Sequence, residues 1–149
     1  MSTARGARGK CDLSDAVMST VLVVDDQPEL RLLFQRVLEY QGYTVVSAEN
    51  GQDGLRVIDQ CNPQLILLDM AMPRMDGLTF LQTIRAQQKW AKLPVIMLSG
   101  LMTAEQVAAA RELGVADRLV KAEFSMKELR ARVAQHLRPP VSAAKPAVA

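Results

Sequence analysis

Four aliphatic residues in a row, Leu65 to Leu68, constrain the fold of this chain more than any other segment. The run has no polar face, so it predicts a strand that is buried on both sides, as in a parallel sheet covered by helices. It ends at the carboxylate of Asp69, and turn residues follow from Met70 to Gly77. In an open parallel sheet, ligands bind beyond the carboxyl ends of the strands. Asp69 is therefore predicted to lie at a functional edge of the sheet.

The rest of the chain alternates strand and helix patterns around this run. Including it, strands are expected at 21–24, 44–48, 65–69, 94–98 and 118–120. Each is followed by apolar residues at helical spacing: from Leu30 to Leu38, at Leu55 and Ile58, from Leu78 to Ile84, from about Thr103 to Leu113, and from Met126 to Leu137. Five βα units predict a doubly wound, flavodoxin-like α/β fold, a five-stranded parallel sheet with five helices, for which 2-1-3-4-5 is the common strand order.

Length and composition bound the organisation of the chain. Its 149 residues predict one domain at 20–138, after a disordered extension at 1–19 and before a Pro/Ala-rich tail or linker at 139–149. No apolar run approaches the roughly 18 residues of a membrane helix, and the basic N-terminus has no apolar core of a secretory signal, so a cytoplasmic location and no membrane contact are expected. The net charge of +2 is too small to predict nucleic-acid binding.

The cysteines and the histidine offer no separate site. Cys11 and Cys61 are the only cysteines, and two isolated thiols form neither a metal site nor a disulfide framework. The single histidine, His136, is placed near the end of the last predicted helix, where a partial positive charge suits the helix dipole.

Polar residues end four of the five predicted strands. Asp25 and Asp26 follow the first strand, Asp69 the third, Ser99 the fourth and Lys121 the fifth. In the order 2-1-3-4-5 these four strands are contiguous, about 4.8 Å apart. Three carboxylates so close together repel one another, and a divalent cation with oxygen ligands, for which Mg2+ is the best candidate, removes the conflict.

The two remaining polar residues suit an anion. A hydroxyl from Ser99 and an ammonium from Lys121 could hold phosphoryl oxygens, which predicts phosphoryl transfer to the carboxylate of Asp69. Each residue alone has an ordinary explanation: an Asp pair is more often a helix cap, and Asp26 is a candidate cap for the first helix. Their joint occurrence at the ends of separate strands favours a site.

These residues make the chain resemble a response regulator receiver domain of two-component signalling, over about Thr20 to Leu137. The resemblance rests on four segments: Val23 to Asp26, Asp69 to Gly77, Ser99-Gly100, and Lys121. It implies a phosphorelay switch in which a histidine kinase or phosphotransfer protein phosphorylates Asp69. It implies no enzymatic turnover beyond Mg-dependent self-phosphorylation from small donors and slow self-dephosphorylation.

The resemblance also implies roles for the site residues. Asp26 and Asp69 would bind Mg2+ directly, together with the main-chain carbonyl of Ala71, and Asp25 would act through water. Ser99 would follow the phosphoryl group and Lys121 would pair with it.

The chain departs from the family pattern at three positions. Ala122 follows Lys121 where proline is usual, and a cis bond would cost about 2.5–4 kcal/mol with alanine, so a trans bond is expected. Arg118 replaces the family's switch aromatic, so we expect the loop 100–102 and the start of the next helix to move instead, with Arg118 as a partner contact or in an ion pair with Glu105 or Glu123. Ala71 has no side chain that could orient an attacking water.

Two other functions use the same fold or chemistry. A phosphohydrolase of the haloacid dehalogenase type also forms an aspartyl phosphate. Resemblance to that family would require a second Asp two residues after the nucleophile, and this chain has Ala71 at that position. A flavodoxin-like electron carrier would need a phosphate-binding loop after the first strand, which is absent from this sequence. For the receiver, a downstream protein or a second copy is expected on the last two helices and the fifth strand. Both a stand-alone receiver and a piece of a longer regulator fit the sequence.

Overall fold

A five-stranded parallel sheet forms the centre of the molecule in the computed structural model, which describes residues 19–73, 75–100, 102–121 and 123–137. The strands are β2 (Thr20–Val24), β3 (Thr44–Ala48), β4 (Leu65–Asp69), β5 (Val95–Ser99) and β6 (Asp117–Val120). Their spatial order is β3-β2-β4-β5-β6. Counted along the chain this is 2-1-3-4-5, so the predicted flavodoxin-like topology is confirmed. The expected extension and tail fall almost entirely outside the described residues.

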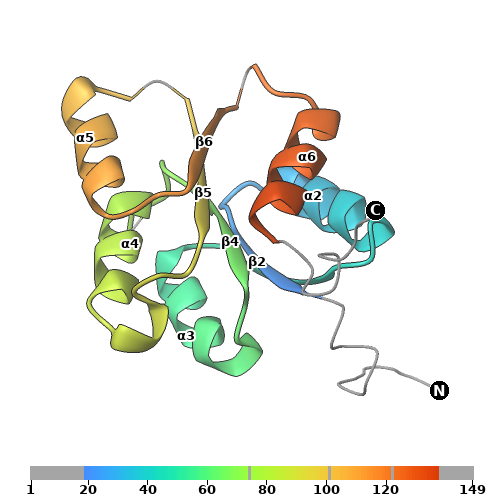
Figure 1. Cartoon of the computed structure of the whole chain (residues 1–149), viewed down its shortest axis with the longest axis horizontal. Coiled ribbons are helices and arrows are strands. Elements are labelled where there is room, and N and C mark those ends of the chain that lie inside the picture. The colour runs from blue at the N-terminus through green and yellow to red at the C-terminus, as the bar shows by residue number, and fades with distance from the viewer. Residues whose placement is uncertain (1–18, 74, 101, 122, 138–149) are drawn as a thin grey trace, which may run out of the picture.

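Helices cover both faces of the sheet (Figure 1). One face carries α2 (Pro28–Tyr40) and α6 (Met126–His136), and the other carries α3 (Gly51–Cys61), α4 (Gly77–Arg85) and α5 (Ala104–Glu112). A short 3-10 helix that the sequence did not predict, η2 (Gln88–Trp90), follows α4. Within the described ranges, no helix is long and apolar enough to cross a membrane.

The central strand β4 explains the aliphatic run in the sequence. All five of its residues are buried. Leu65 and Leu67 pack in the core under α2 and α6, whereas Ile66 and Leu68 pack in the core under the other three helices. Because successive side chains of a strand point to opposite faces, a strand covered on both sides has to be apolar at every position.

The start of α2 differs from the prediction. Pro28 occupies the first turn, where its missing N–H costs nothing, but the N-cap is Gln27, whose side chain makes no capping hydrogen bond. The predicted cap by Asp26 is therefore wrong. The carboxylate of Asp25 instead accepts a hydrogen bond from the Gln27 amide (2.9 Å), which closes a turn directly after β2.

Other predicted boundaries differ by one or two residues. Thr103 caps α5 in a reciprocal capping box with Gln106 and is not part of the helix itself.

Leu33, which fits the apolar pattern of α2, is 41% exposed. It lies on the flank of the helix, because Phe34 and Leu38 fill the space against the sheet.

Candidate functional site

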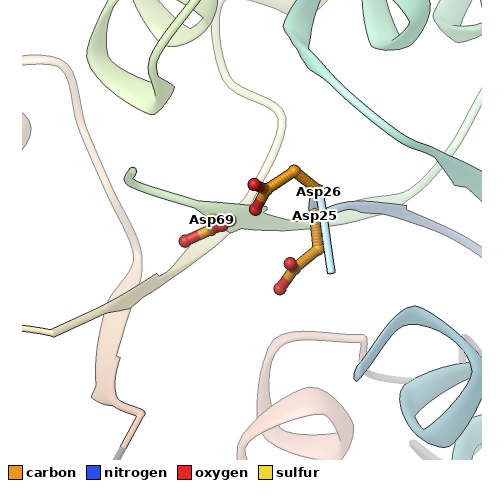
Figure 2. Close-up of side chains that lie close together, drawn as sticks. All are labelled: Asp25, Asp26 and Asp69. Carbon is orange, nitrogen blue, oxygen red and sulfur yellow. The ribbon is translucent and has the colours of Figure 1, made fainter. Parts of the chain in front are cut away.

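The parallel pairing of β2 with β4 brings three carboxylates together. Val24 pairs with Leu68, so the residues that follow, Asp25 and Asp69, leave the sheet side by side. Asp25, Asp26 and Asp69 each place one carboxylate oxygen within 4.8 Å of the others. Figure 2 shows the side chains of Asp25 and Asp26 leaving the end of β2 on different sides. The fold thus brings together the three carboxylates that the sequence analysis placed at neighbouring strand ends.

The three carboxylates differ in burial and in their partners. Asp25 and Asp69 are 0% and 2% exposed, and Asp26 is the most exposed of the three. Oδ2 of Asp69 is buried and has no hydrogen bond within the described part of the chain, and the buried Oδ2 of Asp25 has only the Lys121 ammonium, at 3.4 Å. Buried oxygens without donors are unfavourable. An oxygen-only donor set with such orphaned atoms fits a hard divalent cation such as Mg2+.

Burial also changes the titration of Asp69. The pKa of Asp69 is raised to about 6, chiefly by burial and next by the neighbouring charge of Asp25, while Lys121 opposes both effects. A group with this pKa is mostly a carboxylate at neutral pH, but it is more basic than an ordinary Asp. It is therefore a better nucleophile than an exposed carboxylate.

Lys121 lies directly after β6 and reaches the carboxylates from the far side of β5. Its ammonium nitrogen is 3.1 Å from Asp69 Oδ1 and 3.4 Å from Asp25 Oδ2. The Lys121 amide donates to the Ser99 carbonyl (2.6 Å), so the backbone at Lys121 extends the pairing of β5 with β6. Among the described residues, Lys121 is thus the one cation that forms ion pairs with Asp25 and Asp69.

Ser99 ends β5 between the strands that carry Asp69 and Lys121. Its side chain is fully buried, and its hydroxyl has no hydrogen-bond partner in the described residues. A buried hydroxyl without a partner is a donor that remains available to an anion at this edge. A Cβ added to the next residue, Gly100, would contact nothing within 4 Å, so the backbone here faces open space.

The segment after Asp69 folds back tightly onto the end of β4. The Ala71 amide lies 3.3 Å from Asp69 Oδ1, and the Gly77 amide donates to the Met70 carbonyl (2.8 Å). A Cβ on Gly77 would lie 2.6 Å from the Asp69 carbonyl oxygen, closer than any side chain allows. A hollow lined by Met70, Ala71, Met72, Asp76 and Gln106 opens beside this segment.

Two residues of the site carry no signal in the sequence. Gln27 accepts a hydrogen bond from the ammonium of Lys121 (3.4 Å). Arg31 donates from Nη1 to the main-chain carbonyl of Asp25 (2.8 Å). Both follow the Asp pair closely in the chain, but only the fold determines that their side chains turn back toward it.

The structure describes one of the two unusual positions near Lys121, Arg118, but not the other, Ala122. Arg118 is exposed on β6, and no ion pair joins it to Glu105 or Glu123, all three being described residues. The peptide bond at Ala122 lies outside the described residues.

His136 is the last residue of α6, as the sequence predicted. Its Nε2 lies 3.3 Å from the carboxylate of Asp117, which also binds Arg132.

Comparison with known proteins gives a consistent result. A family model described as the response regulator receiver domain matches residues 21–134. The chain is 37% identical over 118 residues to a probable transcriptional regulator ycf27 of Porphyridium aerugineum, covering 79% of this chain and 48% of the relative.

Two further matches agree. The chain is 36% identical over 121 residues to the DNA-binding dual master transcriptional regulator RpaA of Synechocystis sp., covering 81% of this chain and 50% of that protein. Its fold is similar to that of the chemotaxis protein CheY4 of Vibrio cholerae, with a TM-score of 0.74 and 28% identity over 79% of this chain and 98% of that one. The chain spans about half the length of the curated relatives it matches.

Proposed function

This chain belongs to the response regulator receiver domain family, and we propose that it is a phosphoacceptor of a two-component phosphorelay, phosphorylated on Asp69. The observation that carries the proposal is the position of Asp69: buried at the end of the central strand, with Lys121 at 3.1 Å and two further carboxylates within 4.8 Å. The phosphoryl donor is a histidine kinase or a phosphotransfer protein, consistent with membership of this family.

The reaction is a transfer of a phosphoryl group from a histidine nitrogen to a carboxylate oxygen. An oxygen of Asp69 forms the new bond to phosphorus while the phosphorus–nitrogen bond breaks, and the departing nitrogen keeps the bonding electrons and takes up a proton. Lys121 lies where it can pair with the transferred group, and the unpaired hydroxyl of Ser99 can donate to one of its oxygens. Negative charge that accumulates during transfer is thus stabilised by groups already in place.

A magnesium ion fits this arrangement. Asp26 and Asp69, together with the main-chain carbonyl of Ala71, are the residues that we propose as direct ligands, and Asp25 is proposed to act through a water molecule. The orphaned Oδ2 of Asp69 and the closeness of the three carboxylates support a cation at this position. When bound, Mg2+ would neutralise charge on the carboxylates and on the phosphoryl oxygens.

A phosphohydrolase that works through an aspartyl phosphate is less well supported. It needs a general acid near the phosphorylated Asp, and the residue two positions after Asp69 is Ala71, which has no ionisable side chain. The family match also favours the switch. An electron carrier is disfavoured by the same match.

The output surface is proposed to lie on α5, β6 and α6. β6 is one of the two edge strands of the sheet, and Arg118 is exposed on it. Arg118 lines two hollows. One lies between α5 and β6 (Val107, Ala110, Arg111, Val115, Asp117), and the other lies between the end of β6 and α6 (Leu119, Val120, Glu123, Phe124, Glu128). An exposed cation between two hollows suits a downstream protein or a second copy of the chain. The relatives' names concern transcriptional regulation by proteins about twice as long, and we propose that the domain controls such an output through protein contacts.

Small phosphodonors test the proposal directly. Incubation with acetyl phosphate and Mg2+ should add the mass of one phosphoryl group to the wild-type chain and none to Asp69→Asn. Asp76→Asn is the matched control, because it lies in the same segment and Asn keeps the capping hydrogen bond to the Thr79 amide. Equal phosphorylation of wild type and Asp69→Asn would place the acceptor elsewhere and refute the proposal.

A further inference from the structure

Arg31 is bound twice to the turn that carries the acidic pair, the Asp25–Gln27 turn. Its guanidinium Nη1 donates to the main-chain carbonyl of Asp25 (2.8 Å), and its own amide donates to the carbonyl of Gln27 (3.0 Å). Arg31 lies within α2, just after the turn, and its side chain is partly buried. The residue thus fixes the carbonyl on each side of Asp26.

The Asp25 carbonyl needs such a donor because the sheet no longer supplies one. β2 ends at Val24, and the Asp25 amide makes a last backbone hydrogen bond to the Ala48 carbonyl (3.2 Å). Within the described ranges, the Asp25 carbonyl accepts a hydrogen bond from Arg31 alone. A buried carbonyl that loses its donor is unfavourable, so the backbone would shift to find another.

Asp26 depends on this arrangement more than its neighbours do. The Asp25 side chain is held by the Gln27 amide and by Lys121, at 2.9 Å and 3.4 Å. Among the described residues, no amide, hydroxyl or cationic group holds the side chain of Asp26, and its carboxylate lies beside that of Asp69. Its carboxylate is therefore positioned by the backbone of the turn. We propose that Arg31 is a positioning residue of the metal site, which holds the Asp25–Gln27 turn so that Asp26 faces the cation; this rests on the magnesium site proposed above.

The role of Arg31 as a positioning residue can be separated from its charge. A positive charge near a metal site repels the cation, so removing the charge alone should strengthen Mg2+ binding. Removing a hydrogen bond that orients a ligand should weaken it, and loss of such outer partners typically costs about 10–100-fold in metal affinity. The two effects have opposite signs, and the sign of the change identifies which one operates.

Arg31→Met is the decisive variant, because methionine is unbranched and has neither charge nor donor. We expect the Mg2+ dissociation constant, measured by calorimetry on the full chain, to rise by about tenfold, at the lower end of that range. Arg36→Met is the matched control: Arg36 is an exposed arginine of the same helix, and no ion pair or hydrogen bond of its side chain occurs within the described residues. Its dissociation constant should stay at the wild-type value. An unchanged or lower constant in Arg31→Met would refute the proposal.

Two further measurements exclude a mere loss of folding. Arg31→Lys keeps a donor and the charge, so it should bind Mg2+ more tightly than Arg31→Met and unfold at nearly the wild-type temperature without metal. If Arg31→Met does not fold, Arg31→Gln, which is neutral and too short to replace the guanidinium, takes its place with the same expected sign. Absence of Mg2+ binding in wild type would refute the metal site itself, whereas binding in wild type with no loss in the Arg31 variants refutes only the positioning role.

Discussion

Lys121 and Asp69 form an ion pair of 3.1 Å between strands that are not neighbours, since β5 lies between β4 and β6. The lysine side chain therefore spans the end of β5, where the buried hydroxyl of Ser99 has no partner within the described residues. Lys121, directly after β6, thus contacts the end of β4 through the Asp69 carboxylate and the end of β5 through the Ser99 carbonyl. The pair connects the proposed phosphoacceptor to β6, the strand that carries Arg118.

Replacing Lys121 should raise the pKa of Asp69 further. In Lys121→Met, burial and the charge of Asp25 would act on Asp69 without the opposing ammonium. The loss of one opposite charge at this distance corresponds to about 1–3 pH units. Titration of the labelled Asp69 carboxyl carbon by NMR measures the change, with Lys127→Met, an exposed lysine on α6, as control. A pKa of Asp69 that is the same in both variants would contradict the assigned role of Lys121.

Mg2+ affinity should depend on Asp26 more than on Asp25. The carboxylate of Asp25 is already engaged by the Gln27 amide and Lys121, whereas that of Asp26 is available to a cation. We expect Asp26→Asn to raise the dissociation constant at least about tenfold, equivalent to about 1.4 kcal/mol, and Asp25→Asn to raise it less. Calorimetric titration of both variants under the same conditions gives the comparison. Equal affinities in wild type and both variants would show that the cation site is misplaced.

Without metal, Asp69 should make the protein less stable as the pH rises. Its pKa in the folded chain is raised to about 6, whereas an Asp in an unfolded chain titrates near about 3.9. Between these values only the folded state keeps the proton, so unfolding releases it and the free energy of unfolding falls with increasing pH. The contribution, of the order of 1–3 kcal/mol, is present at the acidic end and lost above the folded pKa.

Urea unfolding across this pH range, with a chelator, isolates the effect. The difference in unfolding free energy between Asp69→Asn and wild type should grow as the pH rises, because the amide does not ionise. Asp76→Asn should follow the wild-type curve. A difference between Asp69→Asn and wild type that does not vary with pH would mean that the pKa of Asp69 is not raised.

Gly77 should not tolerate a side chain. In Gly77→Ala the added Cβ would lie 2.6 Å from the Asp69 carbonyl oxygen and 2.9 Å from the Met70 Cα. Both are backbone atoms, so relief requires the turn to move, at a cost of about 1–3 kcal/mol of unfolding free energy and with slower phosphorylation of Asp69. Gly100→Ala is the control for stability, because its Cβ would contact nothing within 4 Å. Similar denaturant midpoints for the two variants would show that the turn is not constrained by Gly77.

Arg118 should act in partner contact and not in phosphorylation. Its side chain is exposed and lines both hollows of the proposed output surface. Arg118→Ala should leave phosphorylation of Asp69 at the wild-type rate and weaken self-association or partner binding by about 1 kcal/mol or more, because arginine is among the residue types whose truncation costs most when an interface covers them. Ultracentrifugation and amide hydrogen exchange, with and without a phosphoryl mimic, measure both properties. Loss of the exchange response around Gly100 and Met102 in the variant would make Arg118 part of the switch.

The sequence alone was sufficient for the sheet and for the residues at its edge. Runs such as Leu65 to Leu68 have only one stable environment, a strand covered on both faces, and parallel strands bring their carboxyl ends to one edge. Asp25, Asp69 and Ser99 can therefore be assigned to one region from the sequence alone. Local chemistry also determined helix ends, as at Pro28 and at Gly42 with its positive φ.

Only the tertiary structure decided how these side chains are paired. The position of Lys121 between Asp25 and Asp69, the exposed flank of α2 at Leu33 and the hydrogen bond from Arg31 to the Asp25 carbonyl depend on how elements distant in sequence pack. So does the pKa of Asp69, because it depends on burial by several elements and on a charge from a neighbouring strand end. Hydrophobic periodicity determines which face of a strand or helix is buried, but the direction of a long polar side chain depends on the donors and acceptors that the completed fold brings within its reach.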